Sequence, residues 1–280
     1  MSHKLDLTIA IPVRNEEQNL PGCLNAIGCD FAQNIVLVDS GSTDATKDIA
    51  KKFGVEVINF IWNGKFPKKR NWYLRNHTPK TKWVLFLDAD EYLTKEFKAE
   101  VREAIISDDK VGYWLNYTVY FLGKRLKGGY PLKKLALFKV GVGEYERIDE
   151  DQWSQLDMEV HEHPVLHGKI GMIKNKIDHQ DFRGISHYIN KHNAYAGWEA
   201  ARFLKSIQEE IPSNWTWRQR IKYQLMQSIF IAPAFFCGSF FFLGGFKDGA
   251  RGFAFAIMKM AYFMKIYCKI KEAKQDKMLW

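Results

Sequence analysis

Three acidic residues follow directly on an apolar run near residue 90. The segment WVLFLDADEYL places Asp88, Asp90 and Glu91 after the run 83–87. Carboxylates beside a buried strand are costly unless a cation or a hydrogen-bond donor meets them. Because residues i and i+2 share a face in an extended segment, we expect Asp88 and Asp90 to face one site. Two such oxygens suit a hard cation, Mg²⁺ or Mn²⁺, whereas Glu91 points away and is expected to be a structural partner. The competing interpretation is a solvated turn before a helix.

Two further groups of polar residues could act with this acidic segment. Asp39 begins the sequence DSGSTD after an apolar run, and Gly41 permits a tight turn there. Asp39 could bond a base or a sugar, or it could only form the turn. Four cations precede the acidic segment: Lys65, Lys68, Lys69 and Arg70. They could meet phosphates, or they could form a solvated helix face.

The elements that must position these side chains alternate along the first 110 residues. Apolar runs predict strands at 7–13, 34–40, 55–60 and 82–88. Helices are predicted after an Asn15 N-cap, at 43–54, at 68–76 and at 94–106, where Thr94 is the expected cap. This order predicts a parallel sheet covered on both faces. Ligands of such sheets bind beyond the carboxyl ends of the strands, where Asp39 and Asp88 lie.

The pattern changes after residue 110. Segments 111–124, 133–141 and 167–179 are predicted to be extended, and 184–210 to be a helix. The segment 228–246 has 19 residues without a charge, interrupted by Pro233 and by glycines. Its length permits a membrane span, and its interruptions favour a bent or re-entrant hairpin. Segment 252–274 mixes lysines with Met, Phe and Tyr, as in an interfacial amphipathic helix. A buried C-terminal helix pair is the alternative.

The positive charge is concentrated in the last part of the chain. Residues 201–280 hold 13 Lys and Arg against 5 Asp and Glu, whereas residues 1–200 hold 28 against 27. Such an excess indicates an anionic partner, a membrane or a nucleic acid. The acidic cluster argues against nucleic acid, because it would repel phosphates. The four cysteines form no CxxC pair, and the N-terminal apolar run is too short for a signal peptide. We therefore expect a reduced, cytoplasmic chain.

Four segments, in this order and spacing, resemble family 2 glycosyltransferases with the GT-A fold: IPVRNEE, VDSGSTD, KKRN and LDADE. The match covers about residues 5–110. Three later segments extend it to nearly the whole chain: EVHEH, HYINKHNAYAGWEA and GGFKDGARGFAFA. They resemble a branch that includes lipopolysaccharide core β-1,4-glucosyltransferases. Two departures stand out, VDS where many relatives have VDD and Arg14 where a Tyr is common. Any role of a second acid after Asp39 is therefore absent in this chain, and base stacking at position 14 stays an open question.

The resemblance implies an α/β fold, with a GT-A (Rossmann-like), mostly parallel central sheet flanked by helices and a C-terminal helical region that associates with membranes. It implies inverting, metal-dependent transfer of a hexose from a nucleotide sugar, UDP-linked first of all, to a lipid-linked or lipopolysaccharide acceptor. Residues 1–110 would bind the donor, 111–200 the acceptor, and 201–280 an anionic membrane surface. The enzyme is expected on the cytoplasmic face of the inner membrane, peripheral or monotopic, without nucleic acid.

The resemblance also implies roles for individual residues. The nucleotide-binding set is Pro12, Arg14, Glu16, Asp39, Arg70 and Asp88. Within it, Asp39 would read the base or ribose and Arg70 would lie near the diphosphate. Asp90, together with Asp88 directly or through a water, would hold the Mg²⁺ or Mn²⁺ that bridges the diphosphate.

An inverting transfer needs a general base, and the segment DMEVHEHP offers three acids. Glu162 is favoured because it follows the branch's histidine, Glu159 is next, and Asp157 is the third. Each could instead be a surface acid. His161, His163 and His167 lack a cysteine and a common zinc spacing. His161 or His163 could assist the metal or the diphosphate, or the histidines could be structural.

Two other functions fit parts of the sequence. A sugar nucleotidyltransferase shares the sheet and the metal carboxylates, but it usually has a glycine-rich phosphate loop where this chain reads PVRNEEQN. A non-enzymatic, membrane-bound nucleotide-sugar-binding protein would bind the donor without turnover.

Overall fold

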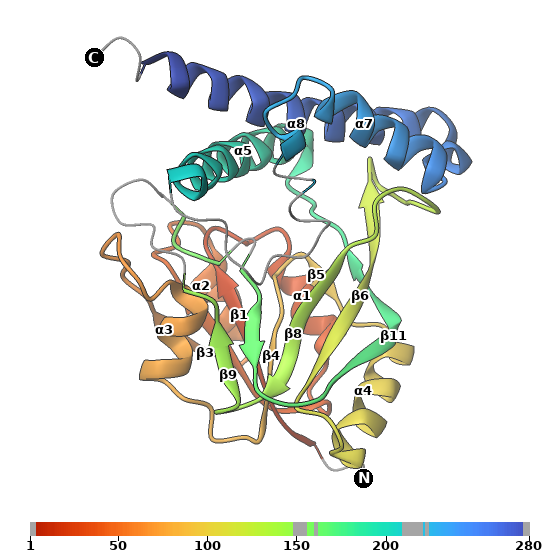
Figure 1. The fold of residues 1–280 in the computed structure, drawn as a ribbon. Helices are drawn as coiled ribbons and strands as arrows, with labels where there is room; N and C mark the ends of the chain where they lie inside the picture. Colours follow the sequence, from red (N-terminus) through yellow and green to blue (C-terminus); the bar gives the residue numbers. More distant parts are fainter. Residues whose placement is uncertain (1–3, 148–155, 160–161, 209–220, 222–223, 277–280) are drawn as a thin grey trace. The chain divides into compact units, whose positions relative to one another are not determined.

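The computed structural model describes residues 4–147, 156–159, 162–208, 221 and 224–276 (Figure 1). The chain divides into two compact units. The first comprises Met1–Tyr120 and Leu132–Phe182, and the second comprises Phe121–Pro131 and Arg183–Trp280. The division by role into 1–110, 111–200 and 201–280 concerns function and stays a prediction.

A mixed β-sheet forms the centre of the first unit. Its strands are β1 (Leu5–Val13), β2 (Ala32–Asp39), β3 (Glu56–Asn59), β4 (Trp83–Phe86), β5 (Glu91–Tyr92), β6 (Gly112–Phe121), β8 (Lys133–Lys139) and β11 (Ile170–His179). They are ordered β3-β2-β1-β4-β8-β6-β11-β5. Strands β3, β2, β1 and β4 run parallel, and β8 is inserted antiparallel between β4 and β6. Strands β9 (Gly143–Tyr145) and β10 (Pro164–Leu166) form a separate antiparallel pair.

The apolar run of β1 suits its position in this sheet. It lies between β2 and β4, and every residue of the strand except Asp6 is buried. A strand covered on both faces needs such a continuous apolar sequence, whereas a strand with one wet face would alternate. The predicted α/β fold with a mostly parallel central sheet is confirmed.

Four helices of the described part of this unit pack against the sheet: α1 (Leu20–Ile27), α2 (Thr46–Lys52), α3 (Lys69–Asn76) and α4 (Lys95–Ser107). The predicted cap of α4 is confirmed, because the Thr94 side chain accepts a hydrogen bond of 3.1 Å from the Phe97 amide. The predicted Asn15 cap is wrong. Asn15 has a left-handed backbone (φ 56°) and α1 begins at Leu20.

Helices build the described part of the second unit. They are α5 (Gly184–Gln208), α7 (Ile231–Cys237), the π-helical turn η1 (Gly238–Phe242), the 3₁₀ turn η2 (Gly245–Asp248) and α8 (Gly249–Asp276), drawn in green-cyan to blue in Figure 1. The short strand β7 (Lys124–Arg125) also belongs to this unit. The segment 228–246 is not one continuous α-helix, because α7 is followed by η1 and then by η2, which begins at Gly245. Its placement as a hairpin in a membrane interface stays a prediction. Among the described helices, none is both long and apolar enough to cross a membrane.

The second unit has its own hydrophobic core. Phe203 of α5 and Ile231 of α7 pack with Phe263, Ile266 and Ile270 of α8, and all are at most 8% exposed. The apolar face of α8 is therefore already covered within this unit, as in the buried-helix alternative. Exposed aromatic side chains of the described part of this unit lie mostly outside α8, at Tyr130, Phe230, Phe241, Phe242 and Phe246, whereas Phe253 lies on α8.

Candidate active site

The carboxyl ends of the parallel strands bring the predicted polar segments to one edge of the sheet. Val13, the last residue of β1, is paired with Asp39, the last residue of β2. On the other side of β1, Ala10 is paired with Phe86, and the Leu87 amide continues this pairing to the Ala10 carbonyl at 3.1 Å. The loops that follow these strands, 14–19, 40–45 and 87–90, therefore start at the same edge.

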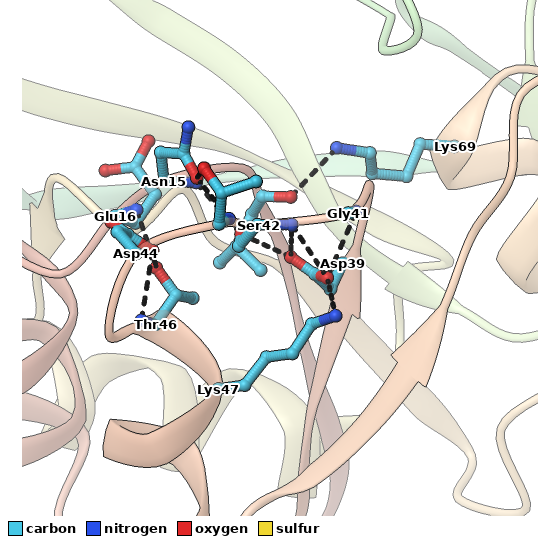
Figure 2. Close-up of polar contacts among 11 residues, drawn as sticks. Asn15, Glu16, Asp39, Gly41, Ser42, Asp44, Thr46, Lys47 and Lys69 are labelled. Atoms are coloured by element: carbon cyan, nitrogen blue, oxygen red, sulfur yellow. Dashed lines mark hydrogen bonds and ion pairs between the residues drawn. The ribbon is translucent and has the colours of Figure 1, made fainter.

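The loops after β1 and β2 are bonded to each other (Figure 2). The Asn15 amide donates to Ser42 Oγ at 2.9 Å, and the Thr43 amide donates back to Asn15 Oδ1 at 2.8 Å. The Glu16 amide donates to Thr46 Oγ1 at 2.8 Å. These reciprocal bonds use the side chain of Asn15 to hold the second loop, which is why it does not cap α1. The two loops form one fixed surface.

Asp39 shapes the second loop from within. It is fully buried, and its carboxylate accepts hydrogen bonds of 3.1 Å from the amides of Gly41 and Ser42. Lys47 Nζ lies 3.2 Å from the same carboxylate (Figure 2). Gly41 has φ 78°, a conformation that favours glycine. The Asp39 carboxylate therefore stabilises the turn 39–42 through these contacts. The turn lies at the carboxyl edge of the sheet.

The other residues predicted in the nucleotide pocket lie on or next to the first loop. Pro12 is buried within β1, and Arg14 is exposed just beyond it. Glu16 Oε2 accepts a hydrogen bond of 2.9 Å from Asn19 Nδ2. Asn19, which the sequence did not single out, is fully buried and also bonds Asp181 at 3.2 Å. The first loop is therefore tied to the segment that follows β11.

Three cations at the start of α3 are buried rather than solvated. Lys68, Lys69 and Arg70 are 5%, 2% and 8% exposed, so a solvated helix face is wrong for them, while Lys65 is exposed. Lys68 Nζ lies 3.0 Å from Glu162. Each of these cations is matched by an acid, which is the arrangement that buried charges require.

Lys69 links the segment 156–159 to the end of β1. Its Nζ lies 3.3 Å from Asp157 Oδ2 and donates to the Val13 carbonyl at 3.2 Å. Burial would raise the pKa of Asp157, but Lys69 outweighs it and lowers the pKa below its ordinary value. Burial lowers the pKa of Lys69 despite Asp157. The pair, together with the 3.0 Å hydrogen bond from the Lys69 amide to the Asp157 carbonyl, holds the segment against α3.

Glu159 caps α3. Its carboxylate accepts hydrogen bonds from the backbone amides of Arg70 at 3.0 Å and Asn71 at 3.1 Å, and its backbone carbonyl accepts one from the Arg70 guanidinium. A carboxylate at this end of a helix satisfies free N–H groups and matches the helix dipole. Burial raises the pKa of Glu159, although Arg70 opposes this shift. Through these contacts Glu159 fixes the start of α3, the helix that carries Arg70.

Asp88 is held between two cations. Arg70 Nη2 lies 2.8 Å from its Oδ1, and Lys134 Nζ lies 2.5 Å from its Oδ2. Burial would raise the pKa of Asp88, but Lys134 and Arg70 lower it well below its ordinary value. Each carboxylate oxygen of Asp88 therefore already has a cationic partner.

Lys134 is a site residue that the sequence did not reveal. It comes from β8, and its Nζ also lies 2.5 Å from Glu91 Oε1. Burial alone would lower the pKa of Lys134, but Asp88 and Glu91 raise it well above its ordinary value. Glu91 is fully buried and accepts a 3.1 Å hydrogen bond from the Asp88 amide. It shares Lys134 with Asp88, so it does not point away from Asp88 as expected, and its structural role stays a prediction. The sequence KKLALFK gave a weak indication of this role. Neighbouring residues of a strand point to opposite faces, so one of Lys133 and Lys134 had to face the core side of the sheet.

Asp90 faces a histidine from another strand. The acidic segment is not extended as predicted, because a turn closes it with a 3.0 Å bond from the Glu91 amide to the Asp88 carbonyl. Asp90 Oδ2 lies 3.5 Å from His179 Nε2. His179 ends β11, which pairs with β5 in the register His179–Glu91. The turn separates the roles of the acids: Asp88 faces cations, and Asp90 faces a side chain that can bind a metal.

The described residues contain no group of three or more His, Cys, Asp and Glu side chains placed to hold a metal. Asp90 and His179 are the adjacent pair with suitable ligand atoms. Of the histidines considered from the sequence, His161 lies outside the described residues, and the His163 ring packs 5.2 Å from the Trp114 ring. Mg²⁺ commonly uses few protein ligands and takes the rest from substrate phosphates, so the pair fits a substrate-bridging cation.

Comparisons with known proteins identify the family of the chain. Residues 8–161 match the model of the family described as glycosyl transferase family 2. An uncharacterized glycosyltransferase of Rickettsia bellii is 27% identical over 95% of this chain and 89% of its own length. The SPbeta prophage-derived glycosyltransferase SunS of Bacillus subtilis is 39% identical over 34% of this chain and 22% of its own. The crystal structure of S. aureus TarS 1-349 with UDP-GlcNAc aligns with a TM-score of 0.45 at 15% identity, covering 96% of this chain and 92% of that one.

The matched segment covers more than half of the chain and contains the loops after β1, β2 and β4, the start of α3 and Lys134. It thereby sets aside the nucleotidyltransferase and the non-enzymatic binding protein. The chain belongs to glycosyltransferase family 2 and is a glycosyltransferase.

Proposed function

We propose that this enzyme is an inverting, metal-dependent hexosyltransferase. It moves a sugar from a UDP-sugar to a membrane-held saccharide or lipid in the synthesis of a cell-envelope glycan. One observation carries the proposal: Asp88 and Asp90 lie with Arg70, Lys134 and His179 at the carboxyl edge of the sheet. This combination of acids and buried cations suits a diphosphate and a divalent cation.

The nucleoside binds on the joined loops after β1 and β2. Arg14 and Glu16 contribute from the first loop, beside the buried ring of Pro12. Asp39 acts through the turn that it holds, because its carboxylate is already bonded to the Gly41 and Ser42 amides. The turn then offers its remaining polar groups to the base or ribose. A rigid loop suits this role because little order has to be gained on binding.

Asp90 and His179 hold Mg²⁺ or Mn²⁺ in this proposal. When bound, the ion stabilises negative charge on the departing nucleoside diphosphate. Asp88 positions Arg70 and Lys134 beside the metal site, because each of its carboxylate oxygens bonds one of these two cations. Arg70 and Lys134 contribute fixed positive charge near the same diphosphate, which favours the state in which charge develops there.

Glu162 is the proposed general base. It is 5% exposed, and its Oε1 lies 3.0 Å from Lys68 Nζ. Glu162 takes the proton of the acceptor hydroxyl, whose oxygen then bonds to the anomeric carbon. The bond from that carbon to the diphosphate oxygen breaks on the opposite face, and the configuration inverts. Glu159 is the second candidate, less favoured because its carboxylate caps α3.

The acceptor and the location rest on the later motifs and on the charge of the chain. EVHEH, HYINKHNAYAGWEA and GGFKDGARGFAFA resemble the branch of lipopolysaccharide core β-1,4-glucosyltransferases. The basic excess of residues 201–280 suits an anionic membrane surface. We therefore place the enzyme on the cytoplasmic face of the inner membrane, as a peripheral or monotopic protein.

A donor panel tests the reaction. The full chain is incubated with UDP- and GDP-sugars and Mn²⁺, and release of the nucleoside diphosphate is measured with and without a chelator. We expect one UDP-sugar to be turned over, chelator to stop turnover, and Asp90→Ala to lose about 100-fold or more, the scale of removing a key electrostatic group. Glu162→Gln should lose turnover but keep binding of the UDP-sugar. Near-normal turnover by Asp90→Ala would disprove the metal role, and near-normal turnover by Glu162→Gln would disprove the base.

A further inference from the structure

Exposed aromatic side chains are concentrated between α7 and α8, in the second unit. Phe241 is 56% exposed, Phe242 86% and Phe246 53%. We name Phe241–Phe246 the aromatic turn. Folded proteins seldom leave several large apolar side chains together in water unless the surface binds something. The proposed function does not use these residues.

The aromatic turn is held in a fixed shape. Behind it, the Phe240 ring packs against the Phe236 ring at 5.7 Å and against the Phe253 ring at 5.6 Å. Both backbone polar groups of Leu243 are paired: its amide donates to the Gly238 carbonyl at 2.9 Å, and its carbonyl accepts from the Gly129 amide at 2.9 Å. Such pairing suits a segment that enters lipid, because each unpaired backbone polar group is costly where there is no water.

A basic loop is attached to the aromatic turn. We name Leu122–Lys127 the basic loop, in which Lys124, Arg125 and Lys127 are exposed. The amides of Lys127 and Gly128 donate to the Asp248 carboxylate at 2.9 and 3.0 Å. A Cβ on Gly128 would lie 2.1 Å from the Gly244 carbonyl oxygen, so the two segments are in direct backbone contact. The charged side chains therefore lie beside the aromatic ones within one unit.

The excess of positive charge around the two segments indicates an anionic partner. Five cations stand there: Lys124, Arg125, Lys127, Lys247 and Arg251. The acid among them is Asp248, and its carboxylate is occupied by backbone amides. Aromatic side chains flanked by cations match the interface of an anionic bilayer, with rings among the acyl chains and cations at the headgroups.

We propose that the aromatic turn and the basic loop form a docking site for an anionic lipid bilayer. The proposal deepens the proposed function, since it rests on an acceptor that is held in a membrane. It assigns membrane contact to these segments rather than to the apolar face of α8, which is covered inside the unit.

Vesicle sedimentation of the full chain tests the docking site. The vesicles contain phosphatidylglycerol with phosphatidylcholine, or phosphatidylcholine alone. We expect the wild type to bind the anionic vesicles and salt to weaken binding. Phe241→Ser with Phe242→Ser should lower the vesicle affinity at least about tenfold. Lys124→Gln with Arg125→Gln should lower the affinity for anionic vesicles about fivefold for each cation removed.

Control variants change exposed apolar and exposed cationic side chains of the first unit. Ile61→Ser with Ile106→Ser removes residues that are 90% and 73% exposed in the first unit. Lys51→Gln with Lys52→Gln removes two exposed cations of α2. Both should bind vesicles like the wild type. Equal losses in test and control variants, or unchanged binding by the Phe variant, would overturn the docking site.

Two further measurements separate the alternatives. Light scattering checks whether wild type self-associates. If it does, and the Phe variant is monomeric while neither binds vesicles, the surface joins two copies of the chain and the proposal fails. UDP-sugar hydrolysis should be unchanged in the Phe variant, whereas Asp90→Ala should lose hydrolysis and still bind vesicles. The membrane site and the transfer reaction can thus fail independently.

Discussion

Lys134 stands between the buried Glu91 carboxylate and the partly exposed Asp88 carboxylate, which would otherwise repel each other. Asp88 and Glu91 each lie 2.5 Å from its Nζ, and its side chain is 29% exposed. Two acids so close in a low-dielectric environment are compatible with folding only because this cation and Arg70 neutralise them. The candidate active site is therefore preassembled around charge, because cations neutralise its acids before any substrate binds.

Removing this cation should destabilise the first unit. Lys134→Met keeps the aliphatic stem but leaves Glu91 without its cation, and breaking a buried ion pair of this kind costs about 3 kcal/mol. Urea unfolding measures the change. Lys133→Met is the control, because Lys133 is the exposed neighbour on the same strand, and it should stay within about 0.5 kcal/mol of wild type. Equal stability of the two variants would contradict the account of Lys134.

The Asp157–Lys69 pair should make stability depend on acid pH. The pKa of Asp157 is lower in the folded than in the unfolded chain because of Lys69. The stabilisation is therefore fully present above the unfolded pKa, about 4, and is lost as the pH falls through the lower folded value. Asp157→Asn should show a smaller loss of unfolding free energy from pH 5 downward than wild type does. Parallel curves would exclude this pair as a source of the acid sensitivity.

At the scale of elements, local sequence predicted much of what positions the site. The apolar runs located β1, β2 and β4, and Thr94 located the start of α4. The parallel order then placed Asp39 and Asp88 at one edge. Lys134 and His179 were not predicted, because strand pairing over long sequence distances places them beside the acidic segment 88–91. Strand β8 pairs antiparallel with β4, and β11 pairs with β5. The turn at Asp88 was the competing interpretation of the sequence, but it is buried rather than solvated, since Asp90 and Glu91 are 3% and 0% exposed.

Helix α3 carries Arg70 to Asp88, and Glu159 fixes its start. Glu159→Ala removes the acceptor of two buried amides, each of which costs about 1–3 kcal/mol when unsatisfied. We expect a loss of about 3 kcal/mol in urea unfolding and weaker binding of the UDP-sugar, because Arg70 loses its position. Glu144→Ala is the control. It removes an acid bonded to Arg75 on the same helix, in a pair that is 42–47% exposed, and it should change stability by less than about 1 kcal/mol. Equal effects of both changes would mean that Glu159 does not anchor the helix.

At the scale of the whole molecule, chemistry and proposed membrane contact are assigned to different cores. The first unit packs its sheet and helices around Trp83, Phe97 and Phe138. The second packs α5, α7 and α8 around Phe203, Ile231 and Ile266. Each cluster is fully buried within its own unit, as an independently cooperative unit requires. A change in one core should therefore weaken that unit first.

Hydrogen exchange tests this independence. Phe203→Ala leaves a cavity in the second core, a change that costs about 3–5 kcal/mol in well-packed sites. We expect faster exchange of the amides of α5 and α8, with those of β1 and β4 unchanged. Phe138→Ala, a matched change in the first core, should give the reverse pattern. If either variant accelerates exchange throughout the chain, the two cores unfold as one cooperative system. Membrane binding and sugar transfer could then not be lost separately by destabilising one unit.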